Sequence, residues 1–409
     1  MKILVLSLYY PYPLDQGSNI RVFNLLKQLS GHHDVDLITY AHGDEASPSG
    51  LEQLRRYCGA VTVVPVTARA HGRVARAAAL LSPRPRSVVL GHDPAMEGII
   101  TAALRRAHYD VVLVEWLWLA SYVATPRAVP CVLDDHNAEA AMFERRMRFA
   151  GTGLVARSRH RLTLFKLRRY ERDALRRFDQ VTAVSDIDRA RLIALGGSAH
   201  RITTVPNGVD VGAIAFQGRS DTPSPGRLVY PGSLTYTPNL DACAFFAEHI
   251  LPLVRAQRPA TTLAITGKKP AVLPPALRAD GVELLGYVDD VRSVVGGSAA
   301  MVVPLRQGGG TRLKILEAMA LGTPVVSTTV GAEGINVTPG ENILLADDPS
   351  DFARRVVALL DDPALGARLA RAARGLVERE YDWTSIGARM EAVLSRTAAS
   401  GARAARRRP

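Results

Sequence analysis

Short runs of apolar, mostly β-branched residues alternate with longer amphipathic stretches along the chain. In the first half, the short runs fall at residues 3–7, 35–40, 61–66, 111–115, 131–134 and 180–184. Helical spacing is clearest over residues 20–30, where Val22, Leu25, Leu26 and Leu29 form one stripe. Buried strands separated by helices are typical of βαβ units, which build parallel sheets covered by helices. The first half therefore predicts an α/β domain.

A second series of the same kind follows a polar stretch at residues 216–226, which contains Asp221-Thr222-Pro223-Ser224-Pro225-Gly226, a composition typical of linkers. Its strand-like runs fall at residues 228–230, 262–266, 282–285, 300–304, 325–327 and 343–345, with helices expected at 239–258, 311–321, 349–360 and 363–380. We predict an N-terminal domain at 1–215, a linker at 216–226 and a C-terminal domain at 227–380. Both domains are expected to be Rossmann-like doubly wound parallel sheets. A helix at 381–397 is expected to pack back toward the first domain, and a basic tail at 398–409 to be disordered.

The strand pattern also predicts where a ligand binds. In open α/β sheets, ligands lie at the carboxyl ends of the strands. Two successive sheets of this kind are expected to face one interdomain cleft.

Cysteine content and hydrophobic run lengths bear on the compartment. The three cysteines, Cys58, Cys131 and Cys243, are too far apart in the sequence to suggest a disulfide set or a zinc cluster. The longest apolar run, near residues 111–124, is interrupted by Glu115 and is too short to span a bilayer. The apolar start lacks a small-residue cleavage site, which favours a buried first strand over a signal peptide. We expect a cytoplasmic protein with no metal site.

The most informative segment runs from residue 302 to residue 327. A buried strand leads into Gly308, Gly309 and Gly310, then into a helix that Thr311 is placed to cap. Glycines allow a ligand to approach the backbone closely, and free amides at a helix N-terminus attract an anion such as a diphosphate. Glu317, two turns into the helix, could accept hydrogen bonds from ribose hydroxyls. An ordinary ion pair with Lys314, three residues earlier, is the alternative for Glu317.

This segment continues as Leu-Glu-Ala-Met-Ala-x-Gly-x-Pro-Val-Val and resembles the donor-site signature of GT-B-fold glycosyltransferases, especially glycosyltransferase family 4. Residues 205–210, 286–290 and 340–342 agree with that family in order. The resemblance implies retaining transfer of a sugar from a nucleotide-diphosphate donor, with no obligatory metal and no cofactor beyond this co-substrate. Glu317 corresponds to the second glutamate of the family's Glu-x7-Glu motif. Gly309 stands where the first glutamate is expected, which puts the usual contact to the donor sugar in doubt.

The departing diphosphate needs positive charge, because negative charge develops on it as the glycosidic bond breaks. The family's Arg and Lys after the first strand of this domain are missing here, where Gly232 and Ser233 form the turn. Lys268, Lys269, Arg312 and Lys314 are the available cations, and Lys268 and Arg312 are favoured as catalytic groups. Ordinary solvated surface cations are the alternative. Two further segments, Gly232–Ser233 and Tyr287–Val288, are predicted to contact the nucleotide, with a packed strand end as the alternative for the latter.

The first domain offers two candidate contributions. Gly17 and Ser18 follow the first strand, where the resemblance implies a turn close to the donor phosphates, although Ser18 could simply cap the next helix. This turn is not a Gly-x-Gly-x-x-Gly dinucleotide motif, which argues against a dehydrogenase. His136 follows a buried strand and is predicted to contribute to catalysis, with Asp135 or Glu139 orienting its imidazole. A purely structural histidine is the alternative.

Net charge is +12, and most of the excess is local. Residues 140–180 hold twelve basic and four acidic side chains, and five arginines lie from Arg396 onward. Residues 145–177 carry apolar and aromatic side chains among the basic ones, which suits an anionic membrane surface and a membrane-held, lipid-linked or cell-envelope acceptor. An ordinary solvated helix is the alternative. The chain shows no nucleic-acid-binding module, and a non-catalytic GT-B scaffold is the competing function.

Overall fold

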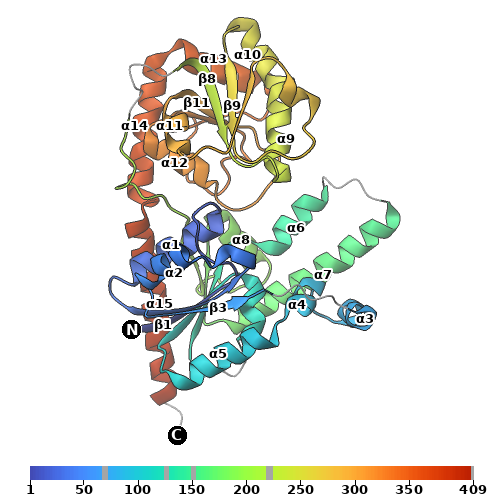
Figure 1. Ribbon diagram of the computed structural model, residues 1–409, viewed down its shortest axis with the longest axis vertical. Coiled ribbons are helices and arrows are strands. Elements are labelled where there is room, and N and C mark those ends of the chain that lie inside the picture. The colour runs from blue at the N-terminus through green and yellow to red at the C-terminus, as the bar shows by residue number, and fades with distance from the viewer. Residues whose placement is uncertain (67–71, 124–128, 149–152, 218–223, 407–409) are drawn as a thin grey trace. The chain divides into compact units, whose positions relative to one another are not determined.

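The computed structural model describes residues 1–66, 72–123, 129–148, 153–217 and 224–406. The chain forms two compact units, Met1–Pro206 together with Ile386–Pro409, and Asn207–Ser385. Each unit is built on one parallel sheet with helices packed against it (Figure 1). Both α/β domains expected from the hydrophobic pattern are therefore confirmed.

The sheet of the first unit has the strand order β3-β2-β1-β4-β5-β6-β7, and every neighbouring pair is parallel. The reversal of strand order beside β1 places the ends of β1, β4 and β5 next to one another, as at a topological switch point. The strands are β1 (Lys2–Ser7), β2 (Asp34–Ala41), β3 (Ala60–Pro65), β4 (Val111–Glu115), β5 (Cys131–Asp135), β6 (Gln180–Ala183) and β7 (Ile202–Thr204).

Helices cover this sheet because each presents an apolar stripe to it, as α1 does with Val22, Leu25, Leu26 and Leu29, all buried. The helices are α1 (Gly17–Leu29), α2 (Pro48–Arg55), α3 (Arg73–Leu81), α4 (Arg86–Gly91), α5 (Pro94–Arg106), α6 (Glu139–Arg148), α7 (Leu154–Arg177) and α8 (Asp186–Ala194), with short 3₁₀ turns η1 (Gly43–Glu45) and η2 (Leu117–Tyr122). Cys58 and Cys131 in this unit, and Cys243 in the other, are free and buried.

The second unit has the strand order β10-β9-β8-β11-β12-β13, again parallel throughout. Its strands are β8 (Ser224–Pro231), β9 (Thr262–Thr266), β10 (Val282–Gly286), β11 (Ser298–Val303), β12 (Val325–Ser327) and β13 (Leu344–Leu345). Its helical elements are α9 (Thr237–Phe245), the π-helical turn η3 (Phe246–Ile250), α10 (Leu251–Gln257), η4 (Pro275–Arg278), α11 (Val291–Gly296), α12 (Leu313–Leu321), α13 (Pro349–Asp361) and α14 (Pro363–Glu380).

The boundary between the units lies earlier than the sequence indicates. The second unit begins at Asn207 instead of 227, because Val209 and Ile214 are buried in its core and Val209 forms a β-bridge with Asp382. The predicted linker at 216–226 is also corrected at its end, since β8 already begins at Ser224. Residues 218–223 of that linker lie outside the described residues.

The C-terminal end is helical where a disordered tail was expected. Helix α15 (Trp383–Arg406) runs through most of residues 398–409, and 407–409 lie outside the described residues. Alanine, the strongest helix former, recurs through this stretch. Upstream, Ile386, Met390, Val393 and Leu394 are fully buried at helical spacing, and residues from Ile386 onward belong to the first unit.

Two further elements differ from the expected pattern. Residues 145–177 form parts of two helices, α6 and α7, with residues 149–152 outside the described chain. The three-residue strand β7 was not expected, because a run this short gives no periodic signal. None of the described helices is long and apolar enough to cross a bilayer.

Candidate functional site

The predicted site residues fall in both units. Gly17, Ser18 and His136 belong to the first unit, and every other predicted site residue belongs to the second. In each unit they gather where parallel strands end, as the strand pattern predicts.

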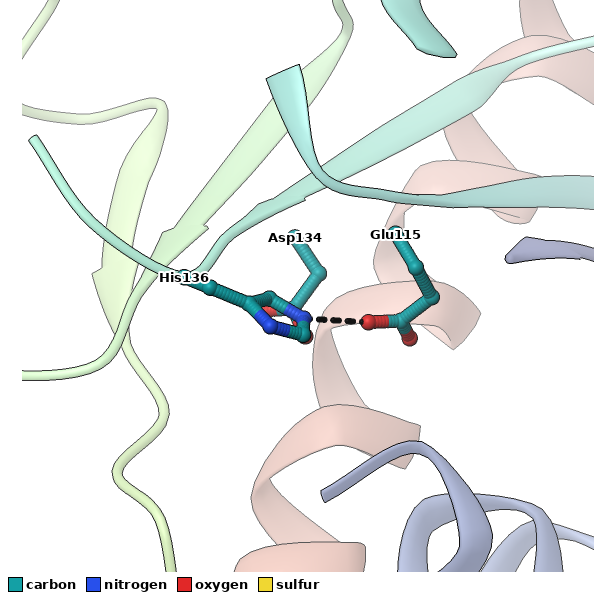
Figure 2. Close-up of side chains that lie close together, drawn as sticks. All are labelled: Glu115, Asp134 and His136. Atoms are coloured by element: carbon teal, nitrogen blue, oxygen red, sulfur yellow. Dashed lines mark hydrogen bonds and ion pairs between the residues drawn. The ribbon is translucent and has the colours of Figure 1, made fainter. Parts of the chain in front are cut away.

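His136 directly follows β5 and is buried against residues at the end of the neighbouring strand β4. Its Nε2 atom lies 2.7 Å from Oε2 of Glu115 and 3.5 Å from Oδ2 of Asp134. Figure 2 shows the three side chains converging. On the other side of the ring, Nε1–H of Trp116 donates a hydrogen bond to Nδ1 of His136. Both ring nitrogens are therefore engaged by protein groups.

These contacts define the tautomer of His136. An indole N–H can only donate, so Nδ1 must present its lone pair to Trp116, and the neutral imidazole carries its proton on Nε2. That proton is donated to Glu115. Trp116 has φ +82°, a conformation that is costly for a residue with a side chain, and it is the only described non-glycine residue with positive φ. The strained backbone is therefore found at the residue that fixes the imidazole.

Burial and neighbouring charges set the proton affinities of this cluster. Burial raises the pKa of Glu115 to about 7, and the charge of Asp134 acts in the same direction, whereas His136 and Arg21 oppose it. Burial lowers the pKa of His136, but hydrogen bonds and charges from Asp134 and Glu115 outweigh this effect and raise it. Glu115 and His136 therefore each change the proton affinity of the other.

Arg21 on α1 is the cation that balances this buried cluster. Its Nε and Nη2 atoms each lie 2.7 Å from an oxygen of Asp134, and both side chains are almost fully buried. The guanidinium also donates to the carbonyl oxygens of Pro206 at 2.8 Å and Val205 at 3.0 Å. Although burial opposes ionisation, Arg21 holds the pKa of Asp134 well below its usual range. The bidentate pair ties the first turns of α1 to the strand that carries His136.

Glu115, Asp134 and His136 also form the one described group whose spacing would suit a metal ion, with ligand atoms within 4.8 Å of one another. However, both oxygens of Asp134 already accept hydrogen bonds from the Arg21 guanidinium, and Thr182 donates to one of them. A cation there would compete with a buried positive charge. The geometry fits an oriented imidazole better than a metal centre.

Gly17 and Ser18 form the first turn of α1. The helix begins at Gly17, and the capping residue is Gln16, so the alternative of Ser18 as the cap is wrong. The first intrahelical backbone bond joins the amide of Ile20 to the carbonyl of Gln16 at 3.0 Å. The amides before Ile20 are the orphan donors of a helix start, which is the feature that suits an anion.

The prediction that Asp135 or Glu139 orients His136 is wrong, because Glu115, Asp134 and Trp116 do so. Asp135 is buried and faces other acids, and burial together with the charge of Glu171 raises its pKa. Burial raises the pKa of Glu139 to about 7. The Glu171 carboxylate accepts hydrogen bonds from the backbone amides of Glu139 and Ala140 at the start of α6.

In the second unit, three strands end in glycines that pack backbone against backbone. The amide of Gly267, after β9, donates to the carbonyl of Gly286, in β10, at 2.6 Å. Gly267 has φ +105°, and a Cβ atom there would lie 2.7 Å from the carbonyl carbon of Gly232, after β8. No other residue type fits such a position without displacing the turn.

Lys314 on α12 extends its ammonium group toward this turn. Nζ lies 4.0 Å from the ring centroid of Tyr230 and 3.4 Å from Oδ1 of Asn239, and a Cβ atom on Gly232 would come within 2.8 Å of it. Burial lowers the pKa of Lys314 to about 7, and the positive charge of Arg312 acts in the same direction. The expected alternative, an ion pair with Glu317, is absent among the described contacts. Lys314 is thus held beside the turn in a state that loses its proton easily.

Asn239 organises the turn around Lys314. Its Oδ1 accepts a hydrogen bond from the Tyr230 hydroxyl at 2.7 Å, and its Nδ2 donates to the carbonyl of Ser233 at 2.9 Å. The Ser233 hydroxyl lies 2.7 Å from that of Thr235. The predicted turn at Gly232–Ser233 is therefore rigidly supported from α9.

The glycine loop before α12 is stabilised by its own arginine. Gly308 and Gly310 have φ +136° and +70°, and the Arg312 guanidinium donates to the carbonyls of Gly309 and Gly310. The prediction that Thr311 caps the helix is wrong, since α12 begins at Leu313 with Arg312 in the capping position. Arg312 folds back onto the loop.

The remaining predicted residues lie around these turns. Lys268 is exposed, and its backbone carbonyl accepts the Leu234 amide at 2.8 Å. Glu317 is partly buried on α12, and burial raises its pKa. Tyr287 and Val288 follow β10, and Tyr287 is 75% exposed, so a packed strand end is excluded for its side chain.

Six functional-site side chains were not among the sequence predictions. They are Arg21, Glu115, Trp116, Asp134, Tyr230 and Asn239. Glu115 carried a signal, because it is a carboxylate that interrupts an otherwise apolar strand. The others carried none, since their roles depend on which strands become neighbours.

Comparison with known families agrees with the two-unit architecture. The family model described as Glycosyltransferase Family 4 matches residues 16–212, and the model described as Glycosyl transferases group 1 matches residues 225–362. Together the two models span both parallel sheets.

Individual relatives are more distant. The chain is 29% identical over 288 residues to glycogen synthase of Mycobacterium tuberculosis, and this alignment covers 66% of the chain and 64% of that protein. It is 28% identical over 242 residues to phosphatidyl-myo-inositol mannosyltransferase of Mycobacterium leprae, covering 54% and 60% of the two chains. The chain thus matches less than two thirds of the length of these relatives.

Solved structures share the fold. Alr3699/HepE of Anabaena, crystallised with UDP, matches with a TM-score of 0.66 at 16% identity, covering 97% of this chain and all of that one. The sucrose-phosphate synthase of Thermosynechococcus elongatus matches with a TM-score of 0.72 at 18% identity, covering 98% and 100%. Taken with the two family models, these matches identify the chain as a member of the GT-B glycosyltransferases, with a family 4 domain followed by a group 1 domain.

Proposed function

We propose that the protein transfers a sugar from a nucleotide-diphosphate donor to an acceptor, with retention and without a metal ion. The observation that carries this proposal is the turn at the ends of β8 and β9, where Gly232 and Gly267 bring two backbone segments close together and Lys314 places an ammonium group beside them. A diphosphate needs close backbone approach and local positive charge, and this turn offers both. The relative HepE was crystallised with UDP, which supports a donor of this class.

Each unit would contribute different groups to the reaction. In the second unit, Lys314 and the amides near the glycine loop would stabilise the departing diphosphate, and Glu317 would hold the ribose. In the first unit, the amides of Gly17 and Ser18 suit an anion, and His136 would contact the sugar or the acceptor. Because both nitrogens of His136 are engaged, it would act through a fixed orientation unless Trp116 moves away.

The proposal is tested by measuring donor hydrolysis and transfer with UDP- and GDP-sugars. The parent protein should turn over at least one donor in the presence of EDTA. Glu317→Ala and Lys314→Met should abolish turnover while leaving the thermal unfolding temperature nearly unchanged. Turnover that requires an added divalent ion would contradict metal independence, and the anomeric configuration of the product decides retention.

A non-catalytic scaffold that binds a nucleotide sugar is the second candidate. Gly309 favours it, because this position lacks the glutamate that the resemblance implies for contact with the donor sugar. Nucleotide binding without turnover across a broad donor and acceptor panel would favour the scaffold. Restored or increased turnover in Gly309→Glu would show that the missing carboxylate limits the reaction.

The acceptor is proposed to be held at an anionic membrane surface, which the protein would reach as a peripheral protein on its cytoplasmic face. Helix α7 carries exposed Leu154, Val155, Leu162 and Phe165 among its basic side chains. The name of the Mycobacterium leprae relative specifies a phosphatidyl-myo-inositol substrate, which supports a membrane-held acceptor. Co-sedimentation with vesicles tests this contact: the protein should bind anionic vesicles and not purely zwitterionic ones.

A further inference from the structure

A depression of about 400 Å³ on the first unit lies between the C-terminal half of α7 and the segment that joins α3 to α4. Both segments belong to the first unit, and α3, α4 and α7 lie near one another in Figure 1. The lining includes four arginines and one acid, namely Arg84, Arg169, Arg176, Arg177 and Asp173. No residue of this pocket belongs to the groups around His136 or Lys314.

Arginines outnumber acids in this pocket. Nε of Arg169 lies 3.9 Å from the Asp173 carboxylate, a long and solvent-exposed pair. Nε of Arg177 donates a hydrogen bond to the Asp173 backbone carbonyl at 3.3 Å. Within the described chain, Arg84 and Arg176 have no ion-pair partner. Planar guanidinium groups bind phosphate oxygens in pairs, so the pocket suits a phosphate group.

The walls of the pocket are held by contacts to the rest of the unit. Tyr170 lines it, is almost fully buried, and its hydroxyl donates to the Leu117 carbonyl at 3.3 Å. Nζ of Lys166 donates to the Leu80 carbonyl at 2.6 Å, which fixes the end of α3 against α7. The arginines on α7 therefore extend from an anchored helix face.

Exposed apolar side chains continue from the pocket. Leu80 and Leu81 end α3 and are 57% and 88% exposed, and Phe165 on α7 is 65% exposed. Leu162 and Phe165 precede Arg169 by seven and four residues, which places them on the same face of α7. Apolar groups beside a phosphate-binding pocket match a lipid, whose acyl chains adjoin its phosphate, better than a free phosphate ion.

We propose that the pocket formed by Arg84, Arg169, Arg176 and Arg177 binds the phosphate group of an anionic membrane phospholipid. This inference rests on the membrane contact proposed above and specifies which chemical group is recognised and where. It does not depend on the transfer reaction. The arginines contact the phosphate while Leu81 and Phe165 enter the acyl-chain boundary.

The test compares two triple variants with the same charge change. Arg84→Gln/Arg169→Gln/Arg176→Gln alters the pocket, whereas Arg157→Gln/Arg159→Gln/Arg161→Gln alters exposed arginines elsewhere on α7. Full-length proteins are sedimented with phosphatidylcholine vesicles containing phosphatidylglycerol, and thermal unfolding with and without inorganic phosphate is measured in parallel. Unfolding temperatures without phosphate verify that both variants fold.

The pocket variant is expected to lose vesicle affinity at least tenfold more than the control variant. The single variant Leu81→Ser is expected to bind vesicles more weakly than the parent protein. Any stabilisation of this variant by inorganic phosphate should be the same as in the parent. Equal losses in the two triple variants would overturn the pocket and leave a general electrostatic attraction. Vesicle binding absent from the parent would overturn the membrane contact itself. Inorganic phosphate could stabilise the parent protein but not the pocket variant, while neither protein binds vesicles. This outcome would show that the pocket binds free phosphate and would overturn the proposal that its phosphate belongs to a lipid.

Discussion

Replacing Lys314 tests whether its ammonium group binds the donor diphosphate. The ammonium lies beside Gly232 with an aromatic ring at 4.0 Å and an amide oxygen at 3.4 Å, and no described carboxylate pairs with it. A diphosphate in the turn would add negative charge next to the ammonium group, beyond the effect of Glu317. Binding should therefore draw a proton onto Lys314 and raise its pKa from about 7.

The size of the effect follows from the protonation equilibrium. With a pKa of about 7, Lys314 is about half protonated at pH 7 and about 1% protonated at pH 9. The terminal phosphate of a nucleoside diphosphate, with a pKa near 6, is about 90% ionised at pH 7 and almost fully ionised above pH 8. If binding requires the ammonium form, affinity should fall about tenfold per pH unit above pH 7.5, and binding at pH 7 should take up about half a proton.

Isothermal titration calorimetry with UDP and GDP measures both quantities. Titrations at pH 7 in two buffers of different ionisation enthalpy give the proton uptake, and a series from pH 7.5 to 9.5 gives the slope. Lys314→Arg is the matched control, because an arginine stays charged, so its affinity should be independent of pH. Lys314→Met should bind about 10–100-fold more weakly at pH 7, the loss of one charge-assisted hydrogen bond.

Two outcomes would refute this reasoning. A parent protein whose affinity stays constant from pH 7.5 to 9.5 does not couple binding to Lys314 protonation. An equal pH slope in Lys314→Met would assign the proton to another group.

Three further changes probe the groups that support the two sites. Glu115→Gln should lower the pKa of His136, because it removes a carboxylate that stabilises the charged ring. Titration of the imidazole by ¹⁵N-edited NMR measures this pKa. An unchanged titration would exclude Glu115 as the partner of His136. Arg21→Met leaves a buried carboxylate unpaired and should cost about 3–5 kcal/mol in urea denaturation, and a loss below 1 kcal/mol would contradict the pairing. Gly267→Ala should lose nucleotide binding because its Cβ meets a backbone 2.7 Å away, whereas Gly98→Ala, with open space around its Cβ, should retain binding. Binding by both alanine variants would show that the close backbone approach is dispensable.

The two sheets were predictable because the alternation of apolar runs with amphipathic stretches along the chain indicates strands and helices in turn. The predicted strand runs are apolar stretches that must be buried wherever the sheet forms, and the structure places a strand at every one of them. The boundary at Asn207 was not predictable from the sequence. Val209 and Ile214 follow the strands of the first unit along the chain, and only the structure shows that they are buried in the core of the second unit. Strand β8 likewise begins within residues that have linker composition.

The site was predictable only as far as its turns. Gly232, the glycines before α12 and His136 could be singled out as candidates because turns at strand ends depend on local sequence. Their partners depend on which strands lie side by side: β4 next to β5 brings Glu115 to His136, and α12 beside the end of β8 brings Lys314 to Gly232. The position of Lys314 against the turn, while Lys268 is exposed, depends on neighbouring elements in the same way.

The charged groups proposed to bind the donor and those proposed to contact a membrane lie in different units of the chain. Few positive charges lie around the donor turn, and the Arg312 guanidinium donates hydrogen bonds to the glycine loop. Binding of a diphosphate there would therefore depend largely on Lys314, whose pKa is lowered to about 7. On α7, by contrast, arginines exceed the acids that could pair with them, and they remain charged at any physiological pH. Donor affinity should therefore respond to pH, whereas attraction to an anionic surface should respond to salt. Because these two dependences arise from different residues in different units, they can be measured separately in the same protein.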